Sequence, residues 1–259
     1  MSEIVDDYYA HYYGKVHGGA ATGAANAKLQ HDLERPHEGK HFDWVLELGA
    51  GNLSHISHVQ HSFDTYVAGD IRTPQSLEGW HVLKQGEVPS SSGRHFVELD
   101  AQTLSFEDAS FDRLAATCLL MHLDDPESAL RDWRRVVRPG GVLDILIPCD
   151  PGAAVRLYRA LFSRRRAKKL GFEYFDLVNA SDHKRPVGSL LTITRYVFAD
   201  DDMQIDWFPF GHIPSWNANS HLVLRVRRAS PQGHSREWNA TQMGSIKSET
   251  VAVERSLES

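Results

Sequence analysis

The chain has 259 residues, of which 41% are hydrophobic and 24% are charged, and its formal net charge at pH 7 is −6. A chain of this length and composition can bury one full hydrophobic core. The acidic balance argues against broad nucleic-acid binding, in which a basic surface supplies most of the affinity. The two cysteines, Cys118 and Cys149, lack the CxxC spacing of a zinc site and indicate no disulfide framework.

Residues 1–13 contain neither the basic region nor the apolar stretch of a secretory signal peptide. No apolar run approaches the roughly 20 residues that span a bilayer. We therefore expect a cytoplasmic protein without a membrane span. The composition leaves its oligomeric state open.

The first half of the chain has a rhythm of strand, turn and helix that begins at Trp44, after one short helix expected at 24–33. Helices are also expected at 55–61 and at 125–137, and 71–94 is expected to be a connection poor in helix. The expected strands are 44–48, 65–69, 95–99, 111–120 and 142–148. Continuous apolar strands separated by helices predict a parallel sheet covered on both faces.

The second half continues with helices expected at 153–170 and 187–198. Two further strands, 203–210 and 220–228, follow each other closely enough to form an antiparallel pair at the sheet edge. We therefore predict an α/β, Rossmann-like fold. Its sheet has seven strands, is mostly parallel with one antiparallel strand, and carries helices on both faces.

Candidate ligand-binding groups follow three successive strands. Glu47-Leu48-Gly49-Ala50-Gly51-Asn52 comes directly after the first strand, where glycines let the backbone pass close to a ligand. Asp70 lies 19 positions after Gly51, at the end of the next strand, and can accept both ribose hydroxyls of an adenosine. Asp100 ends the third strand, where it can reach an adenine amino group. Together they predict an adenosine-containing cofactor.

Two cofactors share this logic. A dinucleotide fingerprint requires a third glycine under the pyrophosphate, and Ser54 stands at that position. An acid entering the loop, Glu47, suits the cationic amino-acid end of S-adenosylmethionine better than it suits a pyrophosphate. The residues therefore favour S-adenosylmethionine over NAD.

Residues 42–148 resemble the class I S-adenosylmethionine-dependent methyltransferases. The motifs that carry the resemblance are Val45-Leu46-Glu47-Leu48-Gly49-Ala50-Gly51, Gly69-Asp70, Asp100-Ala101, Ser110-Phe111-Asp112, Leu120-Met121-His122-Leu123 and Arg135-Val136-Val137-Arg138-Pro139-Gly140-Gly141. Asn52 departs from the pattern, since many members carry a small residue there.

The resemblance implies a role for each matching position. Glu47, Gly49, Ala50 and Gly51 are expected around the methionine end of the cofactor. Asp70 is expected to bind the ribose and Ile71 to lie against the adenine. The remaining implied positions are Asp100 and Ala101 at the adenine edge and Leu119 beside the sulfonium.

Methyl transfer is a displacement on an already activated sulfonium, so the protein mainly positions the two reactants. A hydroxyl acceptor additionally needs a general base. His122 follows the fourth strand beside the expected methyl position, and His183 stands next to Asp182 in the insertion that would cover the site. His122 and His183 are therefore the candidate catalytic residues.

Other side chains are candidates for binding the acceptor. Tyr12-Tyr13, Asp182-His183 and Ser215-Trp216-Asn217 resemble a bacterial subgroup associated with cell-surface polysaccharide biosynthesis. That resemblance implies a sugar-like acceptor held by Tyr12, Tyr13, Asp182 and Trp216. His55 lies close enough to the glycine loop to touch a substrate.

A metal site is not expected. His55, His58 and His61 recur every three residues, but at that spacing they drift around a helix and no acid joins them.

The sequence thus predicts a methyltransferase that uses S-adenosylmethionine on a hydroxyl or amine of a small molecule such as a sugar or sugar nucleotide. Its domain is expected to cover 1–228, with 1–40 as an N-terminal cap and 150–200 as the insertion that forms the acceptor site. Residues 229–259 are expected to be a flexible polar tail. A binding or regulatory protein that keeps the fold without the chemistry is the first alternative, and an NAD-dependent oxidoreductase is the second.

Overall fold

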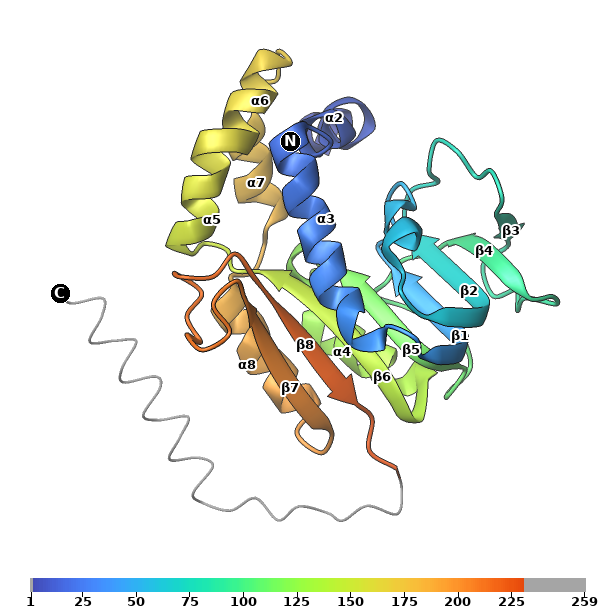
Figure 1. Ribbon diagram of the computed structural model, residues 1–259. Helices are drawn as coiled ribbons and strands as arrows, with labels where there is room; N and C mark the ends of the chain where they lie inside the picture. The colour runs from blue at the N-terminus through green and yellow to red at the C-terminus, as the bar shows by residue number, and fades with distance from the viewer. Residues whose placement is uncertain (1, 231–259) are drawn as a thin grey trace. The chain divides into compact units, whose positions relative to one another are not determined.

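The structure is a computed structural model that describes residues 2–230, and it is built around one eight-stranded sheet (Figure 1). The strand order is β3-β4-β2-β1-β5-β6-β8-β7. The strands are β1 (His41–Leu48), β2 (Ser62–Asp70), β3 (His81–Leu83), β4 (Gly93–Glu98), β5 (Phe111–Thr117), β6 (Val137–Pro148), β7 (Asp202–Phe208) and β8 (His221–Arg227). Nearly all of the predicted tail, from residue 231 onward, lies outside the described residues.

The sheet confirms the predicted mixed architecture. Strands β1 to β6 pair in parallel, and β8 runs antiparallel to both of its neighbours, β6 and β7. The predicted count of seven strands was wrong by one. The additional strand, β3, pairs with β4 at the edge of the sheet, inside the segment that we expected to be a connection. With three residues it is too short to give a period-two pattern in the sequence.

Helical segments connect the strands and precede the first one. They are α1 (Ser2–Asp7), α2 (Tyr13–His17), α3 (Ala20–Glu34), α4 (Pro126–Val136), α5 (Ala153–Tyr158), α6 (Arg164–Lys169), α7 (Phe175–Asp182) and α8 (Val187–Val197), with π-helical turns at Tyr8–Tyr12 and Arg159–Ser163 and 3₁₀ turns at Arg35–His37, Ser54–His58 and Leu120–His122. The predicted helices at 125–137, 153–170 and 187–198 are confirmed, whereas the helix expected at 55–61 is only a 3₁₀ turn. None of the helices in the described part has the length and apolar character to cross a membrane.

The helices cover the sheet on both faces. Figure 1 shows α3 crossing one face and α4 with α8 on the other. Neighbouring residues of β5 serve the two sides, since Leu114 belongs to the large core cluster with Trp133 of α4, whereas Ala115 packs with Leu33 of α3. This alternation is what a sheet buried on both faces requires.

A buried ionic network, which we call the α3 anchor, holds the end of α3 on the sheet. Its members are Glu34, His37, His55, Arg113 and Asp144. Arg113 donates to Glu34 (Nη2–Oε1, 2.7 Å) and to Asp144 (Nε–Oδ2, 2.8 Å). His37 lies 2.7 Å from Asp144 and His55 lies 2.9 Å from Glu34. Burial would raise the pKa of Asp144, but Arg113 and His37 hold it at about 2. The anchor thereby fixes the N-terminal residues over the carboxyl edge of the sheet.

Candidate active site

A cavity of about 1,720 Å³ runs along the carboxyl edge of the parallel strands. Its walls come from the strand ends and from the helical segments at Tyr8–Tyr12, Tyr13–His17 and Phe175–Asp182. Ligand pockets usually measure about 300–1,000 Å³, so this cavity has room for two molecules side by side.

The glycine loop after β1 lines this cavity. Gly49 and Gly51 have φ values of +71° and +54°, a region that side chains other than glycine rarely occupy. A Cβ at Gly49 would come within 3.2 Å of Leu119, whereas a Cβ at Gly51 would meet nothing within 4 Å. The Gly51 N–H donates to Asp70 Oδ2 at 2.8 Å, which ties the loop to the end of β2.

Two carboxylates follow the glycine loop along the same wall. Asp70 also accepts from the Arg72 N–H (2.9 Å), and Asp100 accepts from the Gln102 N–H (2.9 Å). Each carboxylate oxygen has a second lone pair, so both groups can still accept hydrogen bonds from a ligand. Beside them Ile71 leaves 62% of its surface exposed, an apolar contact available to a flat base.

The structure thus brings seven of the nine predicted cofactor residues to one cavity wall: Gly49, Gly51, Asp70, Ile71, Asp100, Ala101 and Leu119. These seven fit an adenosine-containing ligand because they combine an open glycine loop, two carboxylates with free lone pairs and an exposed apolar side chain.

Glu47 and Ala50 lie away from the cavity. Glu47 is buried beneath the glycine loop and accepts a hydrogen bond from the Tyr66 hydroxyl at 2.9 Å. Burial raises the pKa of its carboxyl group. Ala50 packs in the same cluster as Val45 and Tyr66. Strand alternation explains the position of Glu47, because it points to the face that carries Val45.

Two Asp–His pairs lie at the cavity, which His122, Asp182 and His183 line. His122 Nδ1 lies 3.0 Å from Asp182 Oδ2, and His183 Nδ1 lies 2.6 Å from Asp150 Oδ2. The ring centroids of the two histidines are 5.1 Å apart. Asp182 therefore pairs with His122 and not with His183, its neighbour in the sequence.

Asp150 was not among the site residues predicted from the sequence. It follows Cys149 at the carboxyl end of β6, and the strand-end argument that selected Asp70 and Asp100 could have found it. Arg159 was also not predicted as a site residue, although it lines the cavity and pairs with Asp150 (Nη1–Oδ1, 2.9 Å).

Burial and neighbouring side chains shift the pKa values of groups in the two Asp–His pairs. Burial would raise the pKa of Asp150, but hydrogen bonds from His183 and Arg159 lower it. Burial likewise opposes ionisation of Asp182, yet His122 and Tyr9 hold its pKa at about 2. Burial lowers the pKa of His183, so its ring is neutral at pH 7. Arg159 Nη2 also lies 3.0 Å from His183 Nδ1, but the ionised Asp150 requires that this nitrogen carry the proton.

The N-terminal segment contacts two groups of residues that line the cavity. The Tyr9 hydroxyl donates to Asp182, and the Arg72 guanidinium lies 4.8 Å from the centre of the Tyr9 ring. Arg72 also pairs with Asp6 at 2.9 Å. Tyr13 lines the cavity beside them. Residues close to the chain start therefore contact both Arg72, just after β2, and Asp182 of one Asp–His pair.

Three residues predicted to bind the acceptor lie outside the cavity. Tyr12 packs on Phe172, with ring centroids 4.8 Å apart. Trp216 packs against the main core, with its ring near Gly188. His55 is buried in the α3 anchor, where Gln30 and Glu34 bind its two ring nitrogens. Its role there is to hold α3.

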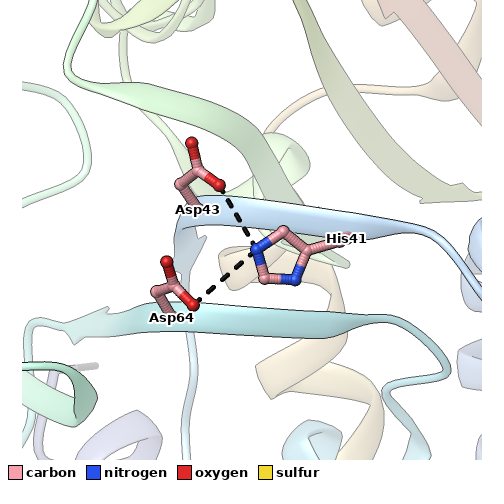
Figure 2. A group of neighbouring side chains, drawn as sticks. All are labelled: His41, Asp43 and Asp64. Carbon is pink, nitrogen blue, oxygen red and sulfur yellow. Dashed lines mark ion pairs between the residues drawn. The ribbon is translucent and has the colours of Figure 1, made fainter.

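From the sequence we expected no metal site at His55, His58 and His61. In the structure these three side chains do not form a group with closely spaced ligand atoms. Among residues 2–230, His41, Asp43 and Asp64 are the group of three whose potential ligand atoms lie within 4.8 Å of one another. Figure 2 shows the ring of His41 between the two carboxylates. The three side chains are exposed, and they lie at the amino ends of β1 and β2, opposite the cavity.

Residues 46–145 match a family model described as a methyltransferase domain. That stretch contains the glycine loop, Asp70, Asp100 and the parallel strands that carry them. Over this stretch the chain resembles the class I methyltransferases. The expected resemblance to this family is thereby confirmed, while the polysaccharide subgroup stays a prediction.

Curated methyltransferases resemble this domain at moderate identity. An O-methyltransferase from Penicillium expansum is 26% identical over 165 residues, which are 58% of each chain. One from Pyrenophora dematioidea is 29% identical over 170 residues, 59% of this chain and 61% of the relative. A ubiquinone/menaquinone biosynthesis C-methyltransferase from Shewanella oneidensis is 30% identical over 131 residues, 49% of this chain and 51% of the relative. The matches thus span less than two thirds of the relatives' length.

Solved structures share the fold of the methyltransferase domain. A chain from the complex between the Haloferax volcanii Trm112 methyltransferase activator and a methyltransferase superposes with a TM-score of 0.58 at 13% identity, covering 87% of this chain and 98% of that one. A SAM-dependent methyltransferase from Thermotoga maritima gives a TM-score of 0.52 at 16% identity, with 88% and 100% covered.

Proposed function

We propose that the protein transfers the methyl group of S-adenosylmethionine to a hydroxyl oxygen of a small molecule. The observation that carries this proposal is a single cavity that is lined both by strand-end carboxylates and by the histidines of two Asp–His pairs. The methyltransferase family match and the O-methyltransferase relatives support it.

Each residue of the cofactor site would contact one part of S-adenosylmethionine. Asp70 would hold the ribose hydroxyls, Asp100 and Ala101 the adenine edge, and Ile71 the adenine face. The Gly49–Gly51 loop and Leu119 would lie toward the methionine part. When bound, the cofactor supplies a methyl group already activated on a sulfonium.

The Asp–His pairs would prepare the acceptor. We assign proton abstraction to His183, because its buried ring is neutral and Asp150 holds the proton on Nδ1. The hydroxyl proton passes to Nε2 of His183 while the oxygen forms its bond to the methyl carbon. A bound cofactor would supply the methyl carbon and its sulfur would keep the electron pair of the methyl–sulfur bond, and His183 would return its proton to water. His122, held by Asp182, is the second candidate for this step.

A direct test incubates the full chain with S-adenosylmethionine and a panel of hydroxyl and amine acceptors, and measures S-adenosylhomocysteine by mass spectrometry. We expect product release that depends on an acceptor with a hydroxyl group. Binding of the cofactor without release of product for any acceptor would favour the non-catalytic alternative. Stabilisation by NADH and not by S-adenosylmethionine would favour an oxidoreductase.

A further inference from the structure

The two Asp–His pairs present two similar nitrogens to one cavity. Both Nδ1 atoms face an aspartate, and no described residue forms a hydrogen bond with either Nε2. The two rings are nearly perpendicular, at 74°, with centroids 5.1 Å apart. One base is sufficient for one methyl transfer, so the second pair has no role in the step described above.

A shared metal does not account for the second pair. Among the described residues, neither pair belongs to a group of three side chains whose potential ligand atoms lie within 4.8 Å of one another. Because Nδ1 of each ring faces oxygens of an aspartate, Nε2 is the nitrogen that each ring can offer to a ligand as a hydrogen-bond acceptor. With ring centroids 5.1 Å apart, the two histidines are near enough to bind two hydroxyl groups on neighbouring atoms of one ligand.

The basicity of the site favours an acidic hydroxyl. Burial lowers the pKa of His183, which makes its ring a weak base. Proton transfer is most efficient when the pKa values of donor and base are close. A phenol, with a pKa of about 10 as in the tyrosine side chain, is far closer to histidine than an aliphatic or sugar hydroxyl is.

The walls of the cavity around the pairs are aromatic. Tyr8, Tyr9, Tyr13, Tyr158 and Phe175 all line it. Rings of this kind offer stacked and edge-to-face contacts to a flat ring. An aromatic acceptor would therefore find apolar contacts on the same wall that carries the two histidines.

Resting on the function proposed above, we infer that the acceptor is a phenol with hydroxyl groups on two neighbouring ring carbons. One hydroxyl lies at His183 and is methylated, and the other donates to Nε2 of His122. The transfer itself balances as described for His183, and the second hydroxyl keeps its proton. This acceptor class replaces the sugar hydroxyl that the sequence alone suggested.

The test compares three simple phenols on the full chain saturated with S-adenosylhomocysteine. Catechol carries neighbouring hydroxyls, hydroquinone carries opposite ones and phenol carries one. Calorimetric titration should give catechol a dissociation constant about tenfold lower than those of the other two, the effect of one well-placed hydrogen bond. His122→Asn should remove that preference, whereas His41→Asn, a matched change at the opposite edge of the sheet, should keep it.

Equal affinity of the native chain for catechol and hydroquinone would overturn the inference without reference to any variant. Survival of the catechol preference in both His122→Asn and His183→Asn would also overturn it. S-adenosylhomocysteine binding separates the two proposals. If that ligand binds and the preference is absent, only the acceptor class fails, whereas absence of that binding defeats the proposed function.

Discussion

The hydrogen bond between His183 Nδ1 and Asp150 Oδ2 occupies one ring nitrogen and leaves Nε2 as the nitrogen that a ligand can approach. An asparagine at position 150 could instead donate its amide N–H to Nδ1, so that the ring proton would move to Nε2.

A general base contributes about 10²–10⁴-fold to such reactions, so His183→Asn should lower kcat by about that factor. If kcat is unchanged in His183→Asn, His183 is not the general base and His122 is the remaining candidate.

The pH profile distinguishes a base from a merely structural histidine. A base acts in its neutral form, so kcat should rise with pH through the pKa of His183 and then level off. Burial places that pKa below the ordinary value of about 6.5. Asp150→Asn should move the rising limb to still lower pH, because the carboxylate favours the protonated ring. A limb that does not move would contradict the pairing.

Tyr9 acts on the site through Asp182 and is a positioning residue. Tyr9→Phe removes one hydrogen bond, and we expect kcat to fall about fivefold, the equivalent of about 1 kcal/mol. Tyr12→Phe is the matched control, because Tyr12 lies outside the cavity and packs on Phe172. Steady-state kinetics gives kcat for both variants. An equal decrease in the two would show that Tyr9 has no specific role in the site.

Among the elements, α3 depends on charges that are fully buried. Arg113→Met would leave the carboxylates of Glu34 and Asp144 without their shared partner, and breaking such a network typically costs about 3–5 kcal/mol. The matched control is Arg131→Met, whose exposed pair with Glu127 should contribute little to stability because solvent screens it. Urea unfolding measures both, and a similar small loss in each would show that the α3 anchor is not needed.

The elements that could be predicted are those whose signals are local. The apolar run before Gly49 predicted β1, and Asp125 with Pro126 predicted the start of α4, where Asp125 indeed accepts from the Ser128 N–H. The strand ends gave Asp70 and Asp100 because the carboxyl ends of parallel strands meet at one edge.

Pairings between distant segments could not be predicted in this way. The neighbours Asp182 and His183 bind different partners, because α7 ends between the loop after β5 and the loop after β6. The burial of Glu47 and His55 depends on which face of the sheet α3 covers. No spacing in the sequence contains that information.

At the scale of the whole molecule, buried histidines make stability depend on pH. Burial lowers the pKa of both His17 and His61 to about 4, against about 6.5 in the unfolded chain. Between these values the unfolded chain binds more protons, so the free energy of unfolding falls as the pH falls from 6.5 to 4. Each group contributes up to about 1.4 kcal/mol per pH unit.

Carboxylates add a second loss at lower pH. Asp144 and Asp182 have pKa values of about 2 in the folded protein, so their contribution disappears as the pH falls from about 4 to 2. Urea midpoints at pH 7, 5 and 3.5 should therefore decrease steadily. A flat midpoint between pH 7 and 5 would contradict the buried neutral histidines.

The cofactor site at the carboxyl edge of the sheet is the central claim, and calorimetric titration with S-adenosylmethionine tests it most directly. The native chain should bind one equivalent saturably. Asp70→Ala should bind at least about tenfold more weakly, because it removes the carboxylate that would hold the ribose and that accepts from Gly51. Asp64→Ala, at the opposite end of the same strand, should bind as the native chain does. Absence of binding by the native chain, or equal affinity in Asp70→Ala, would contradict the account.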